Sequence, residues 1–240
     1  MTTIHLMFHD VFNASPNESG FCGTGPNLYK IDKQKFLSYV ELASNSSQNF
    51  IFTFDDGGVS FYNEIAPMLE KKGEKGIFFI ATKFIGQKGF LTSEQIVDLD
   101  RRGHVIGSHS HSHRRLSELS DEDIFEEWKK SSDILSSILK HPIEYASIPN
   151  GYQSDSVIEM AKKAGYKYLY TSIPTTKIKD NGNIDLIGRF VLTKKSTLHH
   201  VQKLQSPLFR IALRQRSFLL MLLQRIMGSY YKKIRNLIFK

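Results

Sequence analysis

The feature that most constrains this chain is the regular alternation of short apolar segments with amphipathic ones. Helices are predicted at residues 32–43, 60–72, 92–102, 120–139 and 154–164. Strands are predicted at residues 4–8, 50–54, 76–81, 104–107, 145–148, 166–170 and 189–192. This alternation is typical of a parallel α/β fold, either an open doubly wound sheet or a barrel. Both architectures place their functional sites at the carboxyl ends of the strands.

Polar residues follow several of the predicted strands. Asp55, Asp56 and Gly57 come directly after the apolar run 50–54. Two adjacent carboxylates before a glycine are more often solvated turn chemistry than a site. A glycine after such a pair also lets the backbone approach a ligand closely. This feature alone therefore leaves both interpretations open.

A histidine cluster follows the predicted strand 104–107. Residues 109–113 read His-Ser-His-Ser-His, in a chain with nine histidines and one cysteine. In extended backbone all three rings share one face, whereas in a helical turn His109 and His113 share it without His111. Two imidazoles with one carboxylate form a ligand set suited to zinc or another divalent metal that activates water. The competing interpretation is a polar turn with a fortuitous histidine cluster.

These segments together carry a family resemblance. Residues 53–57 (Thr-Phe-Asp-Asp-Gly) and 109–113 resemble the first two motifs of the polysaccharide deacetylases, the nodulation-protein-B-like domain of carbohydrate esterase family four. Leu116 and residues 148–151 (Ile-Pro-Asn-Gly) resemble the downstream leucine and the third motif. The resemblance extends over residues 4–200.

The resemblance implies a fold and a set of roles. The fold is α/β, a distorted (β/α) barrel with fewer than eight strands, and the activity is removal of N-acetyl groups from amino sugars. By position, Asp56, His109 and His113 resemble the ligands of one divalent metal ion, with zinc expected first and cobalt, nickel or manganese also compatible. Asp55 resembles the general base, and the backbone N–H of Asn150 resembles the donor to the oxyanion.

The histidines outside these roles are interpreted separately. His111 falls at a variable position of the second motif, which implies a helical turn for this segment. His9, beside Asp10, follows the first predicted strand and could face the same side as the metal. A structural hydrogen bond explains His9 equally well.

The sequence also departs from the family pattern. Ser147 stands where an arginine orients the base in many members, and Asn150 stands where a tyrosine is usual. His199 and His200 are the candidates for the general acid, and Arg189 is another candidate for the site. A glycan-binding or scaffold protein with little or no activity is therefore an alternative to the N-deacetylase. An O-acetyl esterase is a further alternative because it uses nearly the same metal chemistry.

The C-terminal part of the chain is strongly basic. The net charge is +8, yet residues 201–240 hold nine Lys and Arg and no Asp or Glu, so the first 200 residues sum to −1. From Leu208 the apolar residues recur at helical spacing with arginines between them, and Gly228 is expected to interrupt the helix. We therefore expect a barrel domain at residues 1–206 and a basic amphipathic helical tail at 207–240.

The tail has two main interpretations. Residues 208–240 are typical of a peripheral membrane contact, and the alternative is a helix packed on the barrel. Nucleic acid is disfavoured as a partner because no known binding motif accompanies the charge. The start of the chain lacks signal-peptide features, and no window reaches the roughly 18 apolar residues of a membrane span. The expected location is the cytoplasm, at the inner membrane surface, with an N-acetylated carbohydrate as substrate.

Overall fold

A computed structural model of the chain describes residues 2–227, with side chains described as far as Leu223. Its centre is a nine-stranded sheet in the order β11-β1-β4-β5-β6-β7-β8-β10-β9. Every pairing in this sheet is parallel except that of β9 with β10. The strands are β1 (Thr3–Phe8), β4 (Asn49–Phe54), β5 (Gly76–Ile80), β6 (Val105–Ser108), β7 (Tyr145–Ser147), β8 (Tyr168–Tyr170), β9 (Lys179–Asp180), β10 (Asp185–Ile187) and β11 (Phe190–Val191).

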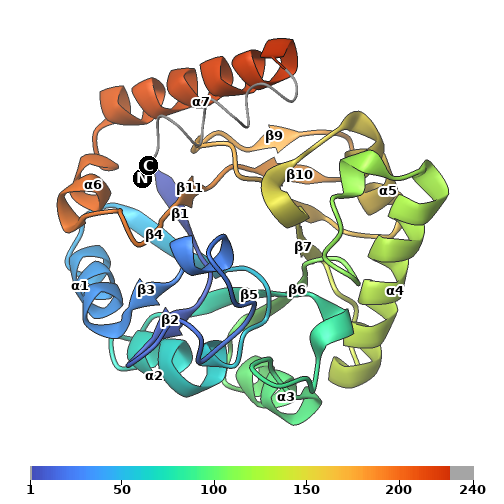
Figure 1. Cartoon of the computed structure of the whole chain (residues 1–240), viewed down its shortest axis with the longest axis horizontal. Coiled ribbons are helices and arrows are strands. Elements are labelled where there is room, and N and C mark those ends of the chain that lie inside the picture. The colour runs from blue at the N-terminus through green and yellow to red at the C-terminus, as the bar shows by residue number, and fades with distance from the viewer. Residues whose placement is uncertain (1, 228–240) are drawn as a thin grey trace.

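The sheet curls into a barrel with helices around its outside (Figure 1). The covering helices are α1 (Lys33–Ser44), α2 (Ala66–Glu70), α3 (Ser93–Arg101), α4 (Asp121–Leu139) and α5 (Asp155–Lys163). The predicted distorted (β/α) barrel is therefore confirmed. The expected number of strands, fewer than eight, is wrong, because the short strands β9, β10 and β11 extend the sheet to nine. The parallel strands bring the segments that follow β1, β4, β6 and β7 to one end of the barrel.

The alternation of side chains along the strands produces two apolar layers. Alternate residues of β4, such as Phe52 and Phe54, point outward and pack in the main core beneath the helices, against Phe36 of α1. The opposite set points inward and forms a smaller cluster around Phe79 and Tyr170. A strand that has helices on one face and a filled barrel interior on the other is buried on both faces, which explains the nearly continuous apolar runs in the sequence.

The barrel has a seam between β11 and the β8–β10 side. No ladder of strand hydrogen bonds joins these edges within the described residues. The segment after β8 lies there instead, and the Ile173 carbonyl accepts a hydrogen bond from the backbone N–H of Arg189. The seam therefore brings Arg189 into the barrel wall.

Most helix ends follow from their capping residues. Asp32, Thr92, Ser120 and Ser154 accept hydrogen bonds from backbone N–H groups in the first turns of α1, α3, α4 and α5. Each such cap satisfies a donor that a helix start would otherwise leave free.

The predicted helix 60–72 differs from the structure. It begins as a π-helical turn, Phe61–Ile65, and continues as the short α2. Pro67 has no N–H to donate to the preceding turn, which accounts for the irregular start. The sequence interpretation also missed β9, β10 and the two-residue strands β2 (Val11–Phe12) and β3 (Ile31–Asp32).

Two helices follow the barrel, α6 (Leu198–Lys203) and α7 (Pro207–Met227). Phe209 and Leu213 of α7 pack against the main core. Among the helices within residues 2–227, none has the length and apolarity needed to cross a membrane. The predicted interruption at Gly228 lies outside the described residues, and the division into residues 1–206 and 207–240 stays a prediction.

Candidate metal centre and active site

The carboxylate pair lies at the carboxyl end of β4. The Asp55 backbone N–H donates to the Phe8 carbonyl at the end of β1, 3.0 Å away, which fixes where the strand ends. Asp56 and Gly57 then take left-handed conformations, with φ of 89° and 90°. A Cβ on Gly57 would lie 3.1 Å from the Ile80 side chain. The close approach to β5 therefore favours glycine here and turns Asp56 toward the barrel mouth.

The histidine segment leaves β6 as an irregular loop. Ser110 and His113 have φ of 61° and 59°, and the segment contains no helical turn. The predicted helical turn is therefore wrong. The two left-handed residues fold the loop back, so the rings of His109 and His113 come to 5.0 Å of one another. His111 points elsewhere, with its Nδ1 3.0 Å from the Thr82 hydroxyl.

A buried glutamate of α4 holds this loop. The Glu127 carboxylate accepts hydrogen bonds from the backbone N–H groups of His111 and Ser112, at 3.1 and 2.7 Å, and from the Ser112 hydroxyl. On the other side, the Thr82 backbone N–H donates to the Ser110 carbonyl at 3.2 Å. Left-handed residues cost energy unless surrounding contacts hold them. These contacts therefore stabilise the conformation that brings His109 and His113 together.

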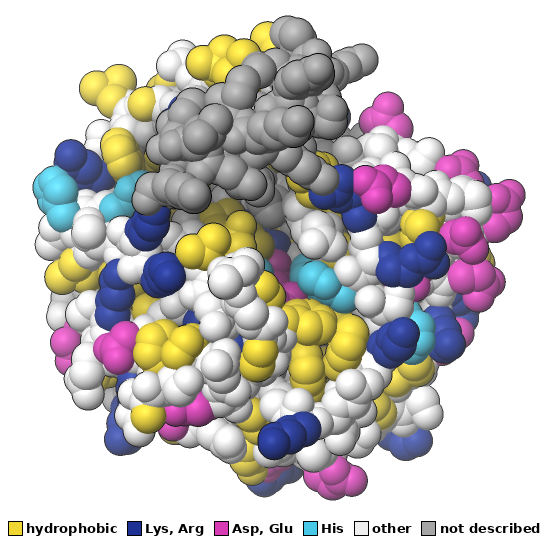
Figure 2. All heavy atoms as spheres, viewed as in Figure 1, with side chains coloured by type: hydrophobic (Ala, Val, Ile, Leu, Met, Phe, Trp, Pro, Cys, Tyr) yellow, Lys and Arg dark blue, Asp and Glu magenta, His cyan; other side chains and the backbone are white. Residues whose placement is uncertain are grey.

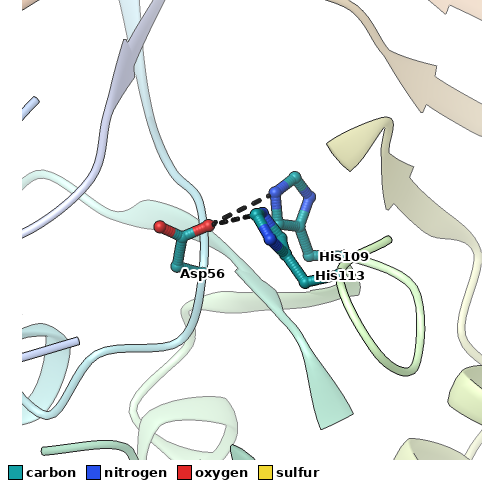
Figure 3. Close-up of side chains that lie close together, drawn as sticks. All are labelled: Asp56, His109 and His113. Atoms are coloured by element: carbon teal, nitrogen blue, oxygen red, sulfur yellow. Dashed lines mark ion pairs between the residues drawn. The ribbon is translucent and has the colours of Figure 1, made fainter. Parts of the chain in front are cut away.

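Asp56, His109 and His113, called the triad below, converge on one point (Figure 3). The Asp56 Oδ1 atom lies 3.5 Å from Nε2 of His109 and 3.1 Å from Nε2 of His113. The three ligand atoms all lie within 4.8 Å of one another. Asp56 and His109 are buried, whereas the His113 side chain is 21 % exposed. The triad is thus open to solvent on one side.

The donor atoms of the triad fit a divalent metal. The Asp56 Oδ1 atom is buried and accepts no hydrogen bond of good geometry within the described residues, which is costly unless a cation binds there. Nδ1 of His109 lies 3.0 Å from the Ser147 carbonyl and donates to it, leaving Nε2 free as a ligand. Metal-binding histidines are commonly oriented by such a second hydrogen bond. Two imidazoles and a carboxylate with an open side are a ligand set for zinc.

Asp55 lies beside the triad and is paired with Arg189. Nη1 and Nη2 of Arg189 donate to the two carboxylate oxygens of Asp55 at 2.7 and 2.8 Å. The guanidinium also donates to the Thr53 hydroxyl at 3.1 Å and, through Nε, to the Thr171 carbonyl at 3.2 Å. Asp55 Oδ2 lies 3.9 Å from Nε2 of His109. The fully buried pair thus joins the seam of the barrel to the triad.

This pairing explains a departure from the family pattern. The Ser147 hydroxyl lies 2.7 Å from Nη2 of Arg189 and 3.3 Å from Oδ2 of Asp55. Arg189 therefore brings a guanidinium to the place that an arginine at position 147 would reach. The sequence analysis named Arg189 as a site candidate without identifying its partner.

The two aspartates stay ionised despite their burial. Burial by itself raises the pKa of Asp55, but the Arg189 guanidinium more than offsets it and lowers the pKa. Burial likewise opposes ionisation of Asp56, whereas the His9, His109 and His113 rings hold its pKa well below the ordinary value. Carboxylates in this state can accept a proton or bind a cation.

Asn150 lies at the mouth of the site. It follows Pro149 in a short turn after β7, is exposed, and has φ of 59°. Its side-chain amide donates to the His113 carbonyl at 3.3 Å. Asparagine tolerates this left-handed conformation better than tyrosine does, which fits the second departure from the family pattern.

Two residues near the triad come from segments that the sequence analysis left out of the site. His9 follows β1 and packs against Tyr29, with 4.8 Å between ring centroids and 38° between the ring planes. Its Nδ1 is buried without a hydrogen-bond partner among the described residues. Phe21, in the loop after β2, lies 4.9 Å from the His113 ring between ring centroids. The position of His9 at a strand end was the available sequence signal. Nothing local marked Phe21.

His199 and His200 lie on α6, and His200 lines a cavity together with Arg189, the partner of Asp55. His199 is exposed, and His200 packs edge-on against Phe209 at 5.3 Å. Within the described residues, neither contacts Asp55 or the triad. Their assignment as general acid stays a prediction that no contact supports.

Comparisons with known proteins bear on this geometry. The model of the polysaccharide deacetylase family matches residues 43–169, which contain Asp55 and the whole triad. The chain belongs to the polysaccharide deacetylase family. Its relatives in this family include YxkH of Bacillus subtilis (strain 168), 29% identical over 150 residues, and a chitin deacetylase of Arthroderma benhamiae, 32% identical over 124 residues.

These matches cover only part of each protein. They span 62% of this chain and 54% of YxkH, and 51% of this chain and 33% of the Arthroderma protein. The chain thus spans about half the length of the first relative and a third of the second. Among solved structures, the Streptococcus pyogenes deacetylase PplD in complex with acetate superposes with a TM-score of 0.71 and 19% identity. That superposition covers 86% of this chain and 99% of PplD, and it supports the fold alone.

Proposed function

We propose that this protein is a metal-dependent hydrolase that removes N-acetyl groups from a glycan containing amino sugars. The observation that carries the proposal is the open triad with the ionised, arginine-paired Asp55 beside it. Membership in the family supports a glycan as substrate, as does the name of the Arthroderma relative, chitin deacetylase.

Asp56, His109 and His113 would hold one divalent cation, with zinc as the first choice. Cobalt, nickel and manganese suit the same ligand types. When bound, such a cation acts as a Lewis acid that polarises a carbonyl and lowers the pKa of water toward about 7. The exposed edge of His113 leaves an opening through which the acetyl group can approach.

Asp55 is the proposed general base. Its carboxylate lies next to the triad, so it can accept the proton of the water that attacks the acetyl carbon. Arg189 is a positioning residue, because its two hydrogen bonds fix the carboxylate and keep it ionised. The backbone N–H of Asn150 is the proposed donor to the oxyanion, a contribution of about 2.7–4 kcal/mol in comparable sites.

The leaving amine must take up a proton, and we assign this step to His9. Its ring is close enough to lower the pKa of both Asp55 and Asp56. Its Nδ1 is buried and unpartnered among the described residues, so no structural hydrogen bond occupies that atom. His9 therefore fits the role better than His199 or His200.

The structure bears differently on the two alternative functions. The glycan-binding or scaffold interpretation rested on the missing arginine and the uncertain acid, and Arg189 and His9 supply groups for both roles. A binding protein also has no need for an ionised carboxylate beside a metal site. The O-acetyl esterase differs mainly in its leaving group, since an alcohol needs less help from a proton donor than an amine does.

Acetate release from N-acetylglucosamine oligomers tests the proposal. The purified chain, supplied with zinc, is expected to release acetate, and Asp55→Asn is expected to lose at least about 100-fold in rate while keeping its metal. His113→Ala is expected to lose both metal and activity. Asp133→Asn, an exposed carboxylate of α4, is the matched control and should behave as the parent.

Two results would contradict the proposal. Acetate release from O-acetylated glycans alone would establish an esterase. Glycan and metal binding without any acetate release would establish a binding protein.

A further inference from the structure

Helix α7 has an apolar face that the barrel does not cover. Phe209, Leu213 and Leu220 are half-buried and face the barrel. The other large apolar side chains of its outward side are exposed: Leu208, Ile211, Phe218, Leu219 and Leu222. Leu208 is 79 % and Phe218 is 64 % exposed. Figure 2 shows hydrophobic side chains along the upper edge of the molecule, where Figure 1 places α7.

These exposed residues form a stripe along one side of α7, called the outer stripe below, in which the exposed polar Gln215 lies between Ile211 and Phe218. Positions 208, 211, 218, 219 and 222 fall on one side of a helix with 3.6 residues per turn. From Leu208 to Leu222 the stripe is about 20 Å long at 1.5 Å per residue. Large apolar side chains gathered in this number on one exposed side of a helix are typical of an interaction surface.

Basic side chains flank the outer stripe. On a helical wheel Arg210 and Arg214 lie on one side of it and Arg216 on the other. Arg210 also donates to the Leu204 and Gln205 carbonyls, and Arg216 lines a cavity with Arg189, so Arg214 is the arginine placed best for headgroups. No acidic residue follows Asp185 in the sequence.

We propose that the outer stripe is a membrane-binding surface and that its partner is a lipid bilayer with anionic headgroups. A helix with an apolar stripe between arginines lies in the plane of a bilayer, its apolar side chains among the acyl chains and its arginines at the headgroups. The charge disfavours a second copy as the occupant, because a two-fold contact through the stripe would bring like-charged arginines together.

The surface lies next to the candidate active site. Leu213 and Leu220 line a cavity of about 250 Å³ together with Arg189, the partner of Asp55. A bilayer on the outer stripe is therefore separated from that wall of the barrel by one helix, about 10 Å across. This step rests on the proposed deacetylase function: a deacetylase bound to a membrane through the outer stripe would act preferentially on glycans held at that membrane surface.

Vesicle flotation of the full chain tests the proposal. The parent is expected to float with vesicles of phosphatidylcholine and phosphatidylglycerol at about seven to three, and much less with phosphatidylcholine alone. Phe218→Glu with Leu222→Glu is expected to lower binding at least tenfold, since it puts two charges in the stripe. Arg214→Gln is expected to weaken binding to the anionic vesicles about fivefold, with little effect on neutral ones.

Ile178→Glu is the matched control, because Ile178 is 57 % exposed but lies outside α7. It should float as the parent does. All variants should release acetate from a soluble oligosaccharide at the parent rate, so a failure of membrane binding is distinct from a failure of the proposed function. Unchanged flotation of the double variant would overturn the proposal. The proposal would also be overturned if the parent does not bind the vesicles and sedimentation shows instead that it is a dimer, which the double variant converts to a monomer.

Discussion

Replacing Arg189 with alanine tests how this chain keeps Asp55, the proposed base, ionised. Arg189 is fully buried and makes two short hydrogen bonds to Asp55, so Arg189→Ala leaves a buried carboxylate without its counter-charge. Removing one partner of a buried ion pair costs about 3–5 kcal/mol. For a chain of this size each kcal/mol lowers Tm by about 2–4 °C, so we expect Tm to fall by about 6–20 °C.

The same change reverses a pH dependence. Because the pKa of Asp55 is lower in the folded chain than in the unfolded one, the Asp55 carboxylate stabilises the folded parent at any pH above its pKa in the unfolded chain. This contribution to stability is lost as the pH falls through the lower pKa of Asp55 in the folded chain. Without the guanidinium the pKa of Asp55 moves upward. The stability difference from the parent is therefore largest at neutral pH and shrinks in acid. The acid limb of the kcat/KM profile moves to higher pH.

A second substitution distinguishes the loss of the guanidinium beside Asp55 from a general destabilisation of the fold. Because Ser147 touches both members of the pair, an arginine placed there can reach the same carboxylate once Arg189 is absent. Ser147→Arg combined with Arg189→Ala is expected to recover part of Tm and to return the acid limb toward its original position. The assay is kcat/KM across pH together with thermal melting, and Ser147→Ala is the control. A parent-like Tm and acid limb in Arg189→Ala would refute the reasoning.

Three other perturbations follow from the contacts described. Glu127→Gln should lower metal affinity about 10–100-fold, because it weakens the hydrogen bonds that hold the loop between His109 and His113. Calorimetric titration measures the affinity, and Glu126→Gln, at an exposed neighbouring position, is the control that should bind metal as the parent does. Burial, with a smaller effect of Arg189, lowers the pKa of His5 to about 4, so the folded chain loses stability as the pH falls from 6.5 toward 4. His5→Phe should remove up to about 3 kcal/mol of that loss, seen as a smaller fall in Tm between about pH 7 and pH 4, and equal falls would contradict this. His9→Asn should lower kcat on N-acetylated substrate by at least about 100-fold with metal content unchanged, and a parent-like kcat would remove His9 from the mechanism.

The fold was predictable because its signals are local. Periodicity and capping residues marked the main helices and the long strands, and the alternation of the two indicated a parallel α/β fold. The two-residue strands were missed because pairing with a neighbour, rather than side-chain pattern, defines them. The irregular start of α2 was missed for a similar reason, since one proline breaks an otherwise helical pattern.

The candidate site was predictable only where it is local. Short motifs pointed to Asp55, Asp56 and the histidines, but the loop that joins His109 to His113 depends on Glu127 in another helix. The pairing of Arg189 with Asp55 joins residues 134 positions apart. No local pattern encodes such a contact, because it forms only when the seam of the barrel comes together.

The most direct test of the central claim is the metal content of the chain. Protein purified without chelator or histidine tag is analysed for bound elements, together with Asp55→Asn and His113→Ala. We expect about one divalent ion per chain in the parent and in Asp55→Asn, and little in His113→Ala. A parent that is free of metal and takes up neither added zinc nor cobalt would contradict the assignment of Asp56, His109 and His113 as a metal centre.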